Sequence, residues 1–171
     1  KEVVFEGYGP HGIAYLVETA TDNNTRTVAN VRSYFTKCGG SLGTSGSVSF
    51  MFDHKCVFRI KYQEGMDIDE LQLALCDCDD DPEVFIEEQE DKDENITKNV
   101  VIYGAYESYG AIQKYIEDNG YELVSGGFER IPNVELKDVT PEQRETLDKL
   151  TGLLEDDDDV TNVYSTLKPA E

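Results

Sequence analysis

The hydrophobic positions divide the first third of the chain into segments of different kinds. Residues 13–18 are almost continuously apolar, which is typical of a strand buried on both faces. In residues 25–37 apolar side chains such as Val31 and Phe35 recur at the spacing of one buried helix face. In residues 48–52 valine and phenylalanine alternate with serine and methionine, which favours a strand. These segments predict the order strand, helix, strand.

The middle of the chain predicts a complete set of elements of its own. Strands are expected at residues 56–62, 83–88, 99–103 and 121–128, and helices after Asp67 and near Tyr109. Asp67 has the position of a helix N-cap, with Glu70 three residues later. The order strand, helix, strand, strand, helix, strand is that of a ferredoxin-like βαββαβ module.

The last segment begins after Pro132. Residues 134–139 are predicted to form a strand and residues 160–165 another. Between them Thr140 and Pro141 are a strong helix start, because proline suits the first helical position. Two half-units thus flank one complete unit. We predict an α+β protein in which residues 1–55 plus 132–171 form a split α/β domain and residues 56–131 an inserted domain, although spacing alone also permits three small units in a row.

Composition narrows the class of protein. The hydrophobic fraction is 39%, there is no tryptophan, and no apolar run approaches the ~20 residues of a membrane span. No signal peptide is visible. Four cysteines without regular spacing do not resemble the disulfide framework of a small secreted protein. We therefore expect a cytoplasmic protein with free thiols and no contact with a membrane.

The charge is unevenly distributed. The net charge is −21, which by itself argues against nucleic acid, because affinity for a polyanion depends on cations. Residues 1–55 hold five cations and five anions, whereas residues 56–171 hold ten cations and thirty-one anions. Since charges farther apart than about 8 Å are largely screened at physiological salt, a local cationic surface in the first third remains compatible with nucleic-acid binding.

The helix at 25–37 and the loop after it carry the candidate binding groups. On a helical wheel Arg26, Asn30 and Lys37 lie opposite the apolar stripe, on a side without carboxylates. Amides freed by glycines, hydroxyls and guanidinium groups all suit phosphate contacts. The predicted nucleic-acid-binding residues are Arg26, Asn30, Arg32, Lys37, Ser41, Thr44, Ser45, Ser47, His54 and Lys55. From the residues alone, a solvated helix face followed by a flexible turn explains the same pattern.

Other chemistry is less well supported. Residues 7–12 match the dinucleotide pattern G-x-G-x-x-G, but that site needs a helix after the glycines and a strand is predicted there. We therefore expect a tight turn. The glycine loop at 39–47 lacks the lysine of a phosphate-binding Walker loop and follows its helix.

Metal binding and catalysis are disfavoured in the same way. Four acidic residues fit positions of a calcium-loop template, namely Asp77, Asp79, Asp81 and Glu88. Pro82 occupies the position that requires glycine, so a solvated acidic loop is expected instead. Cys76 and Cys78 project to nearly opposite sides of a helix, which disfavours a shared metal. Cys38 and His54 could pair, but no third group is placed to orient them. We predict no catalytic residues, no metal and no cofactor.

Three stretches carry a resemblance to a known family. They are G-G-S-L-G-T-S-G-S-V preceded by D-N-N-T-R-T-V-A-N-V-R, E-G-Y-G-P-H-G at 6–12, and L-E-D-D-D-D-V-T-N-V-Y near the C-terminus. The chain resembles the YebC/PmpR family from end to end. That family comprises small regulatory proteins described as transcriptional regulators, and its mitochondrial member is a translational activator. The chain departs from the family at His11, where glycine is usual, and at Cys38 and Ser41, where asparagine is common.

The resemblance implies a function as well as the split-domain arrangement. It points to a non-enzymatic regulator of gene expression that binds nucleic acid, either DNA or the ribosomal RNA and tRNA of the ribosome. The acidic bulk favours the ribosome, since a protein that wraps duplex DNA would not normally carry −21. An acidic adaptor that docks a basic partner, such as a ribosomal protein, is the alternative. Because Lys1 lies inside a predicted strand, we expect the family's basic helical N-terminal domain to be missing from this chain. The oligomeric state is left open.

Overall fold

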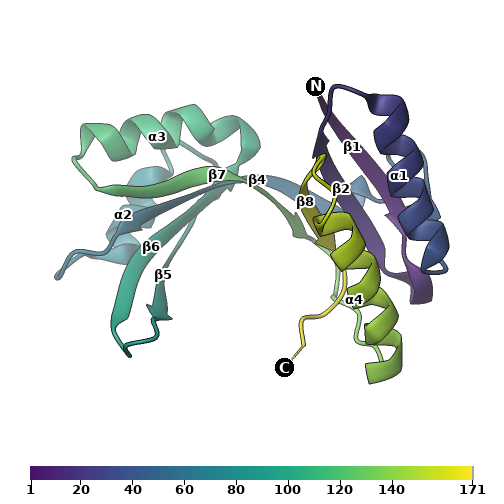
Figure 1. Ribbon diagram of the computed structural model, residues 1–171. Helices are drawn as coiled ribbons and strands as arrows, with labels where there is room; N and C mark the ends of the chain where they lie inside the picture. The colour runs from purple at the N-terminus through teal and green to yellow at the C-terminus, as the bar shows by residue number, and fades with distance from the viewer. Residues whose placement is uncertain (171) are drawn as a thin grey trace. The chain divides into compact units, whose positions relative to one another are not determined.

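The computed structural model describes residues 1–170 and has the predicted α+β fold. The chain divides into two compact units (Figure 1). The first unit consists of residues 1–53 together with the chain from Ile131 onward, and the second of His54–Arg130. These boundaries lie one or two residues from those expected from the sequence. That each unit folds independently, as a domain would, stays a prediction.

The first unit is built on a four-stranded antiparallel sheet. Its strands are β1 (Glu2–Tyr8), β2 (Ala14–Ala20), β3 (Ser41–Leu42) and β8 (Val160–Ser165). Their order in the sheet is β3, β1, β2, β8. A short 3-10 helix, Pro10–Gly12, joins β1 to β2, so the tight turn predicted at the G-x-G-x-x-G pattern is confirmed. His11 has a φ of 65°, a conformation that suits glycine.

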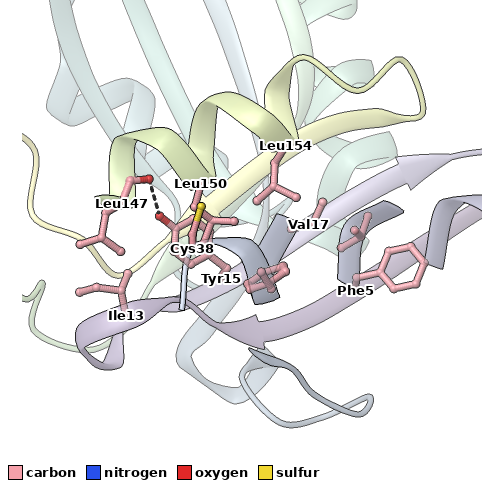
Figure 2. Packing of buried hydrophobic residues seen from close by; sticks show 10 residues of the cluster. Phe5, Ile13, Tyr15, Val17, Cys38, Leu147, Leu150 and Leu154 are labelled. Carbon is pink, nitrogen blue, oxygen red and sulfur yellow. Dashed lines mark hydrogen bonds between the residues drawn. The ribbon is translucent and has the colours of Figure 1, made fainter. Parts of the chain in front are cut away.

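Two helices pack side by side against one face of this sheet (Figure 1). They are α1 (Asn24–Lys37) and α4 (Pro141–Glu155). The side chain of Asn23 caps α1 by accepting the Arg26 N–H, and Thr140 forms the predicted capping box at α4. Figure 2 shows the core between helices and sheet, where the Tyr15 hydroxyl donates to the Leu147 carbonyl at 3.2 Å. The sequence pattern therefore identified both helices and their buried faces.

The segment that covers the opposite face of the sheet differs from the prediction. Residues 48–52 were expected to form a strand, but Ser49–Met51 is a 3-10 helix and the next strand begins only at Phe52. This prediction was wrong because the amides of Val48 and Ser49 bond a side chain instead of a neighbouring strand. Val48 and Phe52 are buried against the face of β2 that α1 and α4 do not cover.

The strand expected at 134–139 was also wrong, since this segment makes only one isolated bridge, between Lys137 and Leu167. In this bridge Lys137 donates its N–H to the Thr166 carbonyl, and the Lys137 carbonyl accepts the N–H of Lys168. The first unit is therefore not assembled from two βαβ halves. It combines a β1–β2 hairpin with α1 on one side of the insertion, and α4 with β8 on the other.

The second unit has the predicted ferredoxin-like βαββαβ order. Its elements are β4 (Phe52–Lys61), α2 (Ile68–Leu75), β5 (Glu83–Glu90), β6 (Ile96–Ala105), α3 (Tyr109–Asp118) and β7 (Leu123–Pro132). The strands are ordered β5, β6, β4, β7. Leu71 and Leu75 from α2 share one core with Ile112 and Ile116 from α3. Both helices therefore cover the same face of the sheet.

Candidate nucleic-acid interface

The chain contains one long stretch without carboxylates. Residues 23–52 hold three cations and no aspartate or glutamate, although 36 of the 171 residues are acidic. This stretch comprises α1, β3 and the glycine-rich loop that ends in the 3-10 helix. Because the rest of the chain is so acidic, this is where a polyanion would meet the least repulsion.

Helix α1 presents all three of its cations to solvent. Arg32 and Lys37 are exposed, and Asn30 is half-buried, while Val31 and Phe35 on the other side are buried in the core. The structure therefore places Arg32 and Lys37 as side chains that a phosphate can reach.

Arg26, the third cation, is bound by a carboxylate. Its Nη2 lies 2.9 Å and 3.0 Å from the two carboxylate oxygens of Asp159, its Nε lies 3.3 Å from one of them, and Asp22 is 3.6 Å away. Hydrogen bonds from Arg26 and from the Thr27 hydroxyl hold the pKa of Asp159 below its ordinary value. The helix itself carries no carboxylate on this side, as predicted, but the loop between α4 and β8 supplies one. Arg26 therefore already has a carboxylate partner, although its side chain is 48% exposed.

The acidic run at 156–159 is thus more than a solvated loop. Asp157 accepts a hydrogen bond from the Tyr34 hydroxyl at 2.7 Å, and burial together with this carboxylate raises the pKa of Tyr34 to about 12. Asp159 also accepts from Thr27 at 2.9 Å. Through Tyr34, Thr27 and Arg26 the run ties the α4–β8 loop to α1.

A buried carboxylate organises the glycine-rich loop. Glu6 on β1 is only 5% exposed, and its carboxylate accepts the N–H groups of Gly46 at 2.7 Å, Val48 at 3.0 Å and Ser49 at 2.6 Å. Burial acts to raise the pKa of Glu6, but these hydrogen bonds outweigh it and the pKa lies below its ordinary value. The expectation that glycines free these amides for phosphate was wrong, because Glu6 already occupies them.

The loop still exposes hydroxyls. Thr44 and Ser45 are exposed, and so is Ser41, whose backbone pairs with Tyr8 in the sheet. The hydroxyl of Ser47 is buried and has no hydrogen-bond partner among the residues that the structure describes. Of the loop residues predicted to bind nucleic acid, Ser47 therefore lies inside the fold and the other three lie on its surface.

His54 and Lys55 belong to the second unit and are considered apart from α1 and its loop. The imidazole of His54 stacks on Tyr106, with ring centres 4.2 Å apart and planes 26° from parallel. Lys55 lines a hollow together with the acidic segment 77–81 and Ser108. Cys38, which the sequence allowed as a partner of His54, is 5% exposed in the core of the first unit.

The acidic segment of the second unit also contains a structural carboxylate. Asp79 is 7% exposed and accepts hydrogen bonds from the amides of Ala105 at 2.8 Å and Asp81 at 3.0 Å, and from the Ser108 hydroxyl. Burial opposes its ionisation, yet these bonds lower its pKa. The expectation of a solvated loop is therefore wrong for Asp79. Among residues 1–170 no cluster of acidic, histidine or cysteine side chains is arranged to hold a metal ion.

Sequence reasoning missed the roles of Glu6 and Asp159. Glu6 was read only as part of a glycine-rich motif, although a charge in a strand of buried residues signals an internal partner. Asp159 is one of four consecutive aspartates for which no role was predicted. No local pattern distinguishes it, because its partner Arg26 lies 133 residues away. No helix within residues 1–170 is long and apolar enough to cross a membrane.

Comparisons with known proteins agree with the resemblance. The model of a family described as TACO1/YebC second and third domain matches residues 1–167. A probable transcriptional regulatory protein of Parabacteroides distasonis is 56% identical over 168 residues, which are 98% of this chain and 65% of that protein. One of the same name from Bacteroides thetaiotaomicron is 56% identical over 171 residues, which are 100% of this chain and 66% of that protein. The chain thus spans just under two thirds of these relatives.

A solved structure has the same fold. The crystal structure of a conserved hypothetical protein from Aquifex aeolicus superposes with a TM-score of 0.71 at 29% identity. The superposition covers 100% of this chain and 66% of that one. The architecture of two units is therefore found in an experimental structure as well.

Proposed function

Because the chain belongs to the TACO1/YebC family, we propose that it takes part in regulating gene expression by binding nucleic acid, without catalysing a reaction. The names of its relatives, probable transcriptional regulatory proteins, support the regulatory role. The binding itself is our proposal, and so is the surface that performs it.

The observation that carries the proposal is the carboxylate-free stretch at 23–52. It offers the exposed cations Arg32 and Lys37 and the exposed hydroxyls of Thr44 and Ser45. Cations and hydroxyls on a rigid surface are the groups that contact phosphate and sugar without reading sequence. Two cations neutralise about two phosphates, which implies a salt slope of roughly −1.4 on single strands. The contact is therefore weak and suits a protein held on its target by other contacts as well.

The charge of the chain favours ribosomal RNA or tRNA over promoter DNA. A net charge of −21 repels a long free duplex from most of the surface. A ribosome exposes basic proteins as well as RNA. The acidic part of the chain can therefore lie against those proteins while α1 contacts RNA. The adaptor hypothesis has support of its own from the second unit, where residues 54–130 hold seven cations and twenty anions.

Charge reversal on α1 tests the proposal. The double variant Arg32→Glu with Lys37→Glu should abolish the salt-dependent part of RNA binding and weaken ribosome association about tenfold or more, because two attractive contacts become repulsive. Co-sedimentation with ribosomes and fluorescence anisotropy on labelled ribosomal RNA and duplex DNA measure it. Both residues are exposed, so the circular dichroism spectrum should not change.

A matched control changes the net charge equally at other places. Lys92 and Lys149 are exposed and lie outside the carboxylate-free stretch. Lys92→Glu with Lys149→Glu should weaken binding less than twofold. Equal losses in the two double variants would mean that only net charge matters. Tighter binding to duplex DNA than to RNA would overturn the choice of target.

A further inference from the structure

The two edges of the second unit's sheet are protected unequally. At one edge β5 carries four glutamates in eight residues. At the other edge β7 begins with Leu-Val-Ser-Gly-Gly-Phe, six residues without a charge. Natural proteins usually guard edge strands with charges or proline, because an open edge offers unpaired backbone groups to any other strand. The edge formed by β7 lacks this protection at 123–128.

This edge is also apolar and exposed. Val124 is 53% exposed, and Leu123 and Phe128 are each 43% exposed. Phe128 lies against Tyr106 with ring centres 5.0 Å apart, and Tyr106 is itself 45% exposed. The core accounts for the glycine at position 126, because a Cβ there would lie 2.9 Å from the Phe58 ring. The core also explains one side of Phe128, whose ring centre lies 4.8 Å from that of Tyr109. The exposure of Val124 has no such explanation in the part of the unit that the structure describes.

The backbone groups of β7 that point outward can be assigned. The amide of Tyr62 donates to Lys98 on β6, so in the antiparallel ladder even-numbered residues of β4 bond β6 and odd-numbered residues bond β7. Gly126 faces Phe58, so even-numbered residues of β7 share a face with even-numbered residues of β4. The amide of Asn133 donates to the Met51 carbonyl, so odd-numbered residues remain bonded to odd-numbered residues to the end of β7. It follows that Gly126 and Phe128 direct their N–H and C=O groups away from the sheet.

The charge of the second unit indicates which kind of partner can bind at this edge. The second unit holds seven cations against twenty anions, and four of those cations are in ion pairs, namely Arg59, Lys61, Lys98 and Lys114. Nucleic acid would be repelled, and a second copy of the chain would bring another −21. An extended segment rich in lysine or arginine is instead attracted.

We propose that β7 is a docking edge, and that an extended basic segment of a partner protein adds to it as a further strand opposite Gly126 and Phe128. Backbone hydrogen bonds would supply affinity, and the apolar side chains of Val124 and Phe128 would pack against alternate side chains of the added strand. This surface is separate from α1 and its loop, so the proposal does not depend on nucleic-acid binding.

A peptide of alternating lysine and valine, nine residues long and labelled with fluorescein, serves as the probe. The whole chain should bind it saturably in an anisotropy titration. Phe128→Pro removes an outward N–H at a position that is 43% exposed, on the side of the strand away from the ladder to β4. It should weaken binding about tenfold, because one backbone bond is lost and the proline ring obstructs the new strand.

The opposite edge supplies the matched control. Ile86 on β5 is 41% exposed, and by the same alternation its N–H points outward. Ile86→Pro should change peptide affinity less than twofold. Slower hydrogen exchange at Gly126 and Phe128 in the complex would locate the added strand.

Several results would overturn the proposal. Equal losses at the two edges would mean that net charge alone attracts the peptide. Undiminished binding of the same peptide with alternate amides N-methylated would exclude strand addition. Dimerisation of the free chain that Phe128→Pro abolishes would assign the edge to a second copy. Absence of peptide binding would show that a basic strand does not dock here.

Discussion

Both units pack two helices against one face of a four-stranded antiparallel sheet, but they offer different surfaces to partners. In the first unit three exposed cations are concentrated in thirty residues without a carboxylate, and one of them, Arg26, is paired with Asp159. In the second unit anions outnumber cations almost three to one throughout, and most cations are paired. The same architecture thus supports one surface suited to phosphate and another suited to basic protein segments. We therefore assign the two kinds of partner to different units.

The units are alike in a second respect, because each depends on one buried carboxylate. Glu6 holds the glycine-rich loop through three amides, and Asp79 holds the start of α3 and the acidic loop through two amides and a hydroxyl. In both units the carboxylate accepts backbone N–H groups that would bond a neighbouring strand in a sheet. Loops of opposite character, one rich in glycine and one rich in aspartate, are fixed by the same chemistry.

Removing either carboxylate should have the largest effect on stability. Glu6→Ala and Asp79→Ala each leave buried donors without a partner, which should lower the free energy of unfolding by roughly 2–4 kcal/mol. Urea denaturation measures the loss. Hydrogen exchange should accelerate mainly within the unit that carries the substitution, if the units fold independently.

Exposed acidic residues nearby are the controls. Glu2→Ala and Asp80→Ala remove the same charge without a buried partner and should change stability by less than about 0.5 kcal/mol. Accelerated exchange in both units from a single substitution would contradict the independence of the units.

Removing the carboxylate that binds Arg26 should have an intermediate effect, and this effect should differ in sign between stability and RNA binding. Asp159→Asn removes the charge that holds Arg26 and weakens the tie between α1 and the α4–β8 loop. We expect a lower melting temperature together with tighter RNA binding, since a third cation becomes available. Asp158→Asn removes an equal charge from an exposed neighbour and should change neither quantity as much. Equal gains in RNA affinity would mean that Arg26 is not the group released.

Helices and their ends were largely predictable from the sequence. The apolar spacing identified α1, and the caps Asp67 and Thr140 identified the starts of α2 and α4, because those signals are local. The ferredoxin-like order of the second unit followed in the same way. The strand predicted at 48–52 was wrong, because an alternating apolar pattern does not require a neighbouring strand. Here Val48 and Phe52 flank the 3-10 helix Ser49–Met51, and both side chains are buried.

The candidate site was less predictable, because its key contacts join distant parts of the chain. The sequence identified the cationic side of α1 and the exposed loop hydroxyls. It could not show that Asp159 binds Arg26 or that Glu6 occupies the loop amides, since neither pair has a fixed spacing. The effect on the site is to reduce the available cations to Arg32 and Lys37.

The smallest expected effect is the pH dependence that Glu6 contributes. Its pKa is lower in the folded chain than its ordinary value of about 4.3, so the unfolded chain binds more protons in that range. The stabilisation by ionised Glu6 is therefore complete above about pH 5 and is lost as the pH falls through the lower pKa of the folded chain. The pKa values of Asp79 and Asp159 are lowered as well, so the acid stability of the wild type alone does not report on Glu6.

Comparison with Glu6→Gln isolates the contribution of Glu6, because glutamine keeps the shape of the side chain without its charge. The difference in unfolding free energy between the two proteins should be constant from pH 7 to about pH 5 and shrink below it. A difference that stays constant into acid would mean that the loop amides do not hold an ionised carboxylate.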